Sequence, residues 1–94
     1  MKYYLYILNT INNTLYCGIT PDIKKRFQKH LTGKGAKYTK MHKPKSIEYI
    51  DIFEDKSLAS KEEYRIKKTL NRIQKLKLIE ENKEKTQILL KELL

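Results

Sequence analysis

A hairpin signal runs directly into a helix signal over residues 3–30, and this stretch constrains the fold more than any other. Residues 3–9 and 15–20 are short runs rich in apolar, aromatic and β-branched side chains, as strands are. Asn12-Asn13 lies between them, and asparagine tolerates the left-handed backbone of tight hairpin turns. The sequence therefore predicts a β-hairpin at the start of the chain.

A helix is predicted immediately after the hairpin. Pro21 ends the second strand, and apolar side chains then recur at every fourth position, which indicates one face of a helix. The residues of this face are Ile23, Phe27 and Leu31. Arg26 and His30 are also four residues apart, so they share a neighbouring face. If the helix packs on the hairpin, a guanidinium, an imidazole and several tyrosine hydroxyls lie on one side of a small sheet.

The rest of the chain supplies a basic loop, a third strand and more helices. Residues 31–46 hold Gly33, Gly35 and Pro44 among lysines and are predicted to form a long loop, which is uncommon in a compact domain without a function. Residues 47–53 are predicted to be a strand, and residues 58–66 a helix. The N-cap candidates of that helix are Asp55 and Ser57.

Two further helices are predicted at the end of the chain. Asn71 followed by Gln74 resembles a capping box that opens a helix. The leucine-rich end, residues 88–94, is either a last helix on the core or a homodimer contact, and the sequence leaves both open. We expect one α/β (α+β) domain with a small, mainly antiparallel three-stranded sheet and flanking helices, in the order β-β-α-β-α-α. Residues 1–80 form its main part and residues 81–94 a C-terminal helical extension.

Charge and composition narrow the function. The 94 residues include 21 Lys plus Arg against 11 Asp plus Glu, a formal net charge of +10. No acidic residue occurs between Ile23 and Ile47, where basic residues cluster. Because a merely solvated surface usually mixes its signs, this clustering predicts a polyanionic partner that neutralises the lysines.

Several classes of protein are excluded by what the sequence lacks. Cys17 is the only cysteine, so no internal disulfide and no cysteine-based zinc site is expected, which fits a reducing cytoplasm. No apolar run approaches the ~20 residues of a membrane span, and no signal-peptide pattern is present. The Gly33-x-Gly35 pair lacks the Lys-Ser/Thr ending of a P-loop, so no nucleotide cofactor is expected. We expect a cytoplasmic protein without a membrane partner.

Short motifs in order along the chain resemble the GIY-YIG nuclease superfamily, in particular its small single-domain bacterial members. The resemblance spans about residues 2–80, and its motifs are Tyr4-Leu5-Tyr6, Tyr16-Cys17-Gly18, Asp22 to Arg26 with His30, residues 33–39 and Glu63 to Lys67. No single motif is specific, but their order and spacing together are. Tyr4 stands where the superfamily has glycine, and Cys17 where it has isoleucine.

The resemblance implies a divalent-metal-dependent DNA endonuclease that attacks a phosphodiester with water. By it, Tyr6 is the general base, with its phenolate favoured by Arg26, the nearby lysines and the metal, and Tyr16 is its support. Arg26 would stabilise charge on the transition state, for which a guanidinium fork is suited. Glu63 would be the only protein ligand of Mg²⁺ or Mn²⁺, with water and phosphate completing the shell.

His30 and the basic residues have several open roles. His30 would transfer a second proton, contact a phosphate, or be a cation at the C-terminus of its helix. The residues predicted to bind DNA are Lys24, Lys25, Lys29, Lys34, Lys37, Lys40 and Tyr38. Tyr38 either stacks on an unpaired base or folds back on its own loop. The alternative function is a nucleic-acid-binding module on the same fold that grips phosphates without cutting, and the strandedness of the substrate is open.

Overall fold

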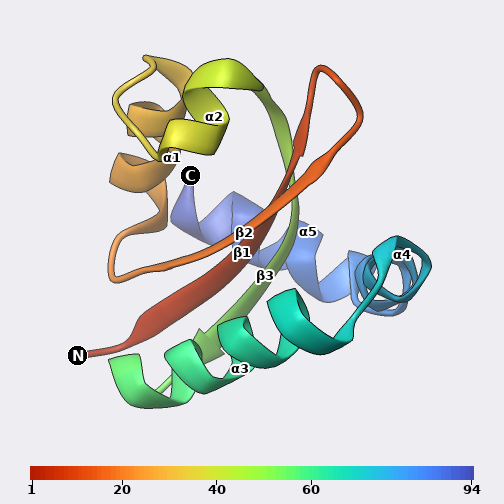
Figure 1. Cartoon of the computed structure of the whole chain (residues 1–94). Helices are drawn as coiled ribbons and strands as arrows, with labels where there is room; N and C mark the ends of the chain where they lie inside the picture. Colours follow the sequence, from red (N-terminus) through yellow and green to blue (C-terminus); the bar gives the residue numbers. More distant parts are fainter.

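The computed structural model describes residues 1–94 and shows a three-stranded sheet with helices on both faces (Figure 1). The strand order is β2-β1-β3, and both pairings with the central strand β1 are antiparallel. The predicted fold class is therefore confirmed. The elements in chain order are β1 (Tyr3–Thr10), β2 (Leu15–Thr20), α1 (Ile23–Leu31), α2 (Lys37–Met41), β3 (Pro44–Phe53), α3 (Lys56–Thr69), α4 (Arg72–Glu81) and α5 (Lys83–Leu93).

The hairpin forms as predicted, with Asn13 in the left-handed conformation at φ 59°. The side-chain oxygen of Thr10 accepts hydrogen bonds from the backbone N–H groups of Asn12 and Thr14, at 3.3 and 3.2 Å. These bonds stabilise the turn, because the Thr10 side chain satisfies two backbone amides that would otherwise need water. The register that follows places Tyr6 opposite Gly18 and Leu8 opposite Tyr16.

The two faces of the sheet carry separate apolar clusters, because side chains alternate along a strand. On one face, α3 and α4 cover a cluster of the buried residues Leu5, Ile7, Cys17, Tyr49 and Ile66. On the other face, α1 and α5 cover a cluster of Tyr6, Leu8, Ile23, Ile47 and Ile50. In Figure 1, α3 runs below the sheet and α5 passes behind it. The candidate site lies on the second face.

Side-chain caps begin three of the helices, α1, α3 and α4. Asp22 accepts a hydrogen bond from the Lys25 backbone N–H at 3.1 Å at the start of α1. Of the two candidates before α3, Asp55 is the cap. Asn71 and Gln74 form the predicted capping box of α4, with both hydrogen bonds at 2.9 Å. Each cap satisfies an amide that the helix leaves free.

The predicted loop over residues 31–46 is only partly a loop. It contains the short helix α2, and β3 begins at Pro44 rather than at Ile47. The proline is tolerated because β3 is an edge strand, and its register against β1 is irregular near that end. The observed order β-β-α-α-β-α-α-α adds two helices to the predicted β-β-α-β-α-α: α2 after α1, and α5 in the predicted C-terminal extension. The sequence did not indicate α2, because the stretch is rich in glycine and lysine. Thr39 is the only buried residue of α2.

The leucine-rich end forms a helix on the core, as one of its two predicted alternatives. Leu89, Leu90 and Leu93 of α5 pack against the cluster on the second face. Ile88 and Leu94 remain 57% and 49% exposed, and a homodimer contact there stays a prediction. None of the helices is long and apolar enough to cross a bilayer.

Cys17 is buried against α3 and has no disulfide partner. Its side chain is only 6% exposed. Burial, and next the negative charge of Glu63, raise the pKa of its thiol to about 12. The thiol therefore stays protonated at neutral pH.

Candidate active site

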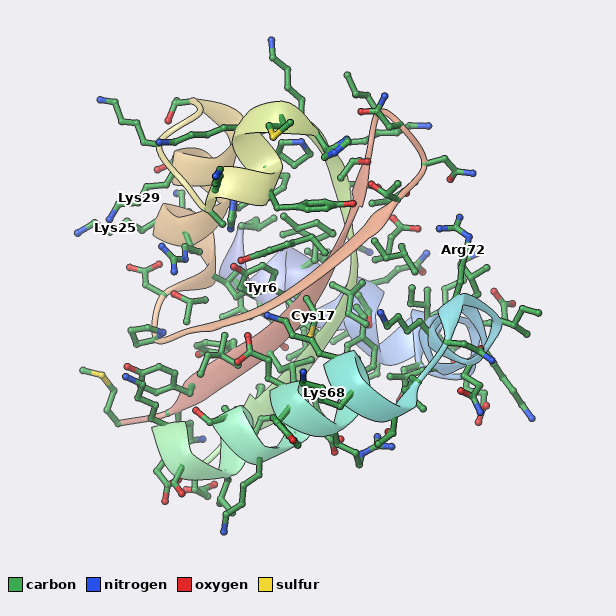
Figure 2. All side chains as sticks on the ribbon, in the orientation of Figure 1. Tyr6, Cys17, Lys25, Lys29, Lys68 and Arg72 are labelled. Atoms are coloured by element: carbon green, nitrogen blue, oxygen red, sulfur yellow. The ribbon has the colours of Figure 1, made fainter.

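Tyr6 is the centre of the candidate site, on the middle strand and 2% exposed (Figure 2). Its phenol crosses over Gly18 on β2. A Cβ atom at position 18 would lie 2.5 Å from the Tyr6 Oη, far closer than two such atoms can approach. Glycine is therefore required at position 18 for the phenol to lie where it does.

His30 accepts a hydrogen bond from the Tyr6 hydroxyl. The Tyr6 Oη lies 2.9 Å from His30 Nε2, and His30 Nδ1 lies 2.7 Å from the Thr39 Oγ1. The Thr39 hydroxyl donates its one hydrogen to the Ala36 carbonyl at 2.9 Å. We therefore assign the hydrogen of His30 to Nδ1, which donates to Thr39, and the lone pair to Nε2, which accepts from Tyr6.

The backbone around His30 is shaped to hold this ring. A Cβ atom at Gly35 would lie 2.3 Å from His30 Nδ1, so only glycine fits there. Gly33 has φ +76°, a conformation that favours glycine, and follows the C-terminus of α1. These two glycines fold the chain back over the imidazole and bring α2 with Thr39 against it.

His30 is neutral at physiological pH. Burial, and then the positive charge of Arg26, lower its pKa to about 4. A helix-end cation is therefore ruled out at pH 7. Both ring nitrogens are engaged inside the protein, which leaves neither free for a phosphate in this arrangement. Of the three predicted roles, proton transfer is the one that the geometry favours.

The depressed pKa makes stability depend on pH. In the unfolded chain the pKa of His30 has its ordinary value of 6.5, and in the folded chain it is about 4. The unfolded chain therefore binds this proton more tightly than the folded chain does. We expect the free energy of unfolding to fall as pH falls through this window, with a slope approaching ~1.4 kcal/mol per pH unit. Urea unfolding of the native chain and of His30→Gln measures the slope. An equal slope in both would assign it to other groups.

Thr39 is a side chain that sequence analysis did not select. Thr39→Val keeps the shape but removes the acceptor of the His30 Nδ1–H, so we expect a loss of ~1–3 kcal/mol of stability. Nitrogen NMR of the imidazole should show that the Nδ1–H tautomer no longer dominates. Thr32→Val is the matched control, because that hydroxyl donates to a backbone carbonyl at an exposed helix end. A native imidazole spectrum in Thr39→Val would contradict the assigned hydrogen bonds.

Tyr16 joins the site through its ring. Its centroid lies 5.5 Å from that of His30 and 6.4 Å from that of Tyr6. Tyr38 of α2 stacks on Tyr16 at 5.7 Å with 20° between the rings, and His42 follows at 4.7 Å from Tyr38. Tyr38 thus packs on a strand residue rather than on its own loop alone, and base stacking by it stays a prediction. We call these five rings the aromatic column.

Arg26 lies beside Tyr6, and the two side chains line the same small gap in the core. Burial raises the pKa of the Tyr6 phenol well above its ordinary value, and the nearby Tyr16 adds to this. Arg26 acts in the opposite direction but does not offset burial. Arg26 thus favours the phenolate, as predicted, but burial outweighs it and the Tyr6 phenol stays protonated in the resting protein. The Arg26 Nε is buried without a hydrogen-bond partner, which is costly unless a ligand supplies one.

Glu63 lies apart from the cluster around Tyr6. Its carboxylate pairs with Lys67, one turn later on α3, at 3.2 Å. The Lys67 ammonium in turn lies 5.6 Å from the centroid of the Tyr16 ring. Glu63 therefore reaches the aromatic column only through Lys67, the last residue of its motif.

The donors around Glu63 fit a hard divalent cation only with help from a substrate. No three His, Cys, Asp or Glu side chains come together anywhere in the chain. One carboxylate suffices for Mg²⁺ when water and phosphate oxygens fill the remaining positions. The side chain is 24% exposed, so such ligands can reach it.

The predicted DNA-binding lysines lie free of acidic partners. The three ion pairs of the molecule involve Arg65, Lys67 and Lys85, and none involves a lysine between residues 24 and 45. Lys25 and Lys29 project outward from α1 (Figure 2). The other exposed members of the predicted set are Lys24, Lys34, Lys37 and Lys40.

Comparison with known proteins shows the family of the chain. Residues 2–77 match the GIY-YIG catalytic domain. The chain belongs to the GIY-YIG family. This domain is that of a nuclease superfamily, and the motif residues Tyr6, Tyr16 and Gly18 are the ones that meet in the site.

Close relatives and a solved structure share nearly the whole length. A UPF0213 protein of Staphylococcus saprophyticus is 49% identical over 80 residues, which cover 85% of this chain and 96% of the relative. One of Oceanobacillus iheyensis is 49% identical over 84% of this chain and 91% of its own. The solution NMR structure of a UPF0213 protein from Bacillus halodurans is 36% identical with a TM-score of 0.58, covering 88% of this chain and 87% of that one.

Proposed function

We propose that this GIY-YIG protein is a divalent-metal-dependent DNA endonuclease that hydrolyses phosphodiester bonds. The observation that carries the proposal is the buried hydrogen bond from Tyr6 to the neutral His30, with Arg26 beside both. In a module that only binds phosphates this bond would contribute stability alone, whereas in a nuclease it would also join a proton donor to an acceptor beside the guanidinium of Arg26.

Tyr6 and His30 can act as one base. Water gives a proton to the Tyr6 Oη while the phenol gives its own proton to His30 Nε2, so neither a free phenolate nor a free proton is needed. The resulting hydroxide forms a bond to phosphorus, and the bond from phosphorus to the leaving oxygen breaks. That oxygen takes its proton from solvent. A base poised within hydrogen-bond reach typically contributes ~10²–10⁴-fold in rate.

A bound substrate would make His30 a better proton acceptor. Arg26 lowers the pKa of His30 in the resting protein, and a phosphodiester bound at Arg26 brings a negative charge that offsets this effect. The base is therefore strengthened only when a phosphate is bound. Arg26 would donate to the phosphate oxygens, whose charge grows in the transition state, and Tyr16 would hold the rings of Tyr6 and His30 in place.

Glu63 would hold Mg²⁺ or Mn²⁺ together with the substrate phosphate. When bound, such an ion supplies Lewis-acid stabilisation of the charged oxygens. Lys67 must release the Glu63 carboxylate for this, and its ammonium lies where it could turn to the phosphate instead. The need for phosphate oxygens predicts weak metal binding without substrate.

A nicking assay tests the proposal. Single-stranded, duplex and branched DNA, and RNA, are incubated with the chain, with and without Mg²⁺. We expect metal-dependent cleavage of at least one DNA, and loss of that cleavage by at least ~10²-fold in Glu63→Gln, because a neutral amide is a poor ligand for Mg²⁺. Glu62→Gln is the control, since Glu62 pairs with Arg65 instead.

The same assay decides the alternative function. Binding of every substrate without cleavage of any, under all metal conditions, would favour the nucleic-acid-binding module. Equal cleavage with and without the chelator EDTA would contradict the metal dependence but not the nuclease activity.

A further inference from the structure

A basic cleft opens beside the candidate active site, and it extends beyond the family motifs to the start of α3. It has a volume of about 520 Å³, within the ~300–1,000 Å³ range of ligand sites. Its walls are α1, the end of β2, the first residues of β1 and the start of α3. The basic side chains that line it are Lys25, Arg26, Lys29 and Lys56. In Figure 1, α1 and the first turn of α3 both lie on the left side of the molecule.

The positive charges in this cleft come from distant parts of the sequence. Lys56 begins α3, about 30 residues after the lysines of α1, and was not among the predicted site residues. None of the three lysines has an ion-pair partner. The single acid of the cleft, Asp22, accepts a backbone hydrogen bond as the cap of α1. Four cations thus converge around one carboxylate, and an anion would reduce the repulsion among them.

Arg26 connects the cleft to the proposed reaction centre. It lines the cleft on one side and the gap beside Tyr6 on the other. A phosphate held by Arg26 for attack is therefore at the inner wall of the cleft. The chain of a nucleic acid must leave that phosphate in two directions, and the cleft is open to one of them.

We propose that this cleft binds the phosphate next to the scissile one, with Lys56 acting together with Lys25 and Lys29. This inference rests on the proposed function, because it takes the phosphate at Arg26 as the reference point. It adds a specific subsite and assigns Lys56 to it. The subsite fixes which way the strand runs from Arg26, while the aromatic column lies on the other side of the same arginine.

Binding measurements test the subsite without any cleavage. Fluorescent oligonucleotides are titrated in EDTA with Lys56→Gln and with Lys77→Gln, which removes the same charge from α4 at the far end of the molecule. We expect Lys56→Gln to weaken binding ~3–10-fold and to reduce the slope of log affinity against log salt by ~0.7–0.9. Lys77→Gln should change neither by as much. Lys56 is exposed, so the variant is expected to fold.

Neutral phosphate analogues identify which phosphate of the strand Lys56 contacts. Single methylphosphonates are placed along the strand, and each loss of affinity is measured for the native chain and for Lys56→Gln. One position should lose its effect in the variant, because the two changes remove the same contact. Where cleavage occurs, this position should be adjacent to the cleaved bond.

The failures of the two proposals are distinguishable. Equal salt slopes for both glutamine variants, or additive effects at every methylphosphonate position, would overturn the subsite even if the chain cuts DNA. A chain that cuts nothing but shows the Lys56-specific position would retain the phosphate site and lose the endonuclease.

Discussion

Arg26→Ala is expected to reduce DNA cleavage by ~10³-fold or more, in line with the loss of other guanidinium and oxyanion donors that act on transition-state charge. The effect should fall on kcat, and binding should weaken only modestly, since neighbouring lysines also contact phosphate. Quantitative nicking under single-turnover conditions separates the two. Arg65→Ala is the matched control, because Arg65 pairs with Glu62 on the exposed side of α3.

The same variant is expected to show two further changes. The buried Nε of Arg26 has no partner, so its removal should leave stability unchanged or increase it. The pKa of His30 should rise, because Arg26 is one cause of its depression. An Arg26→Ala chain that cuts at the native rate, or that unfolds, would remove the arginine from the proposed mechanism.

Tyr6→Phe is expected to lower cleavage by ~10²–10⁴-fold, because the phenol passes the proton of water to His30. The change also leaves His30 Nε2 without its donor, which should cost ~1–3 kcal/mol of stability. Both quantities are measured on the same preparation, by nicking and by urea unfolding. Activity must fall in a sample that is shown to be folded.

Tyr49→Phe provides the control for burial. Tyr49 is 5% exposed, and burial raises its pKa as it does that of Tyr6. It lies on the opposite face of the sheet and its hydroxyl contacts Asp51 at 3.4 Å. Native cleavage by Tyr49→Phe and lost cleavage by Tyr6→Phe would assign the effect to the position of the phenol. Comparable losses in both would point to a general effect on the fold.

Local sequence was enough to predict the parts of the fold that local forces determine. The hairpin turn at Asn13, the cap Asp55 and the capping box of Asn71 are decided by groups within a few residues of one another. The spacing of four between Arg26 and His30 places both on α1 facing Tyr6. These signals persist in the fold because tertiary packing agrees with them.

What sequence could not show depends on contacts between distant segments. Thr39 carries no signal of its own, and it matters only because two glycines bring α2 back over His30. Lys56 faces the lysines of α1 only once α3 has packed along the sheet. The direction of the pKa shift of Tyr6 also depends on burial, which composition does not give.

The buried Cys17 makes this chain a convenient host for site-specific probes. Its thiol is shielded by α3 and protonated at neutral pH, so it should not react with thiol reagents. A single cysteine introduced on the surface could then be tagged with a dye or a spin label without first removing the native one. Distances between such a tag and a labelled oligonucleotide would report the path of the strand across the protein.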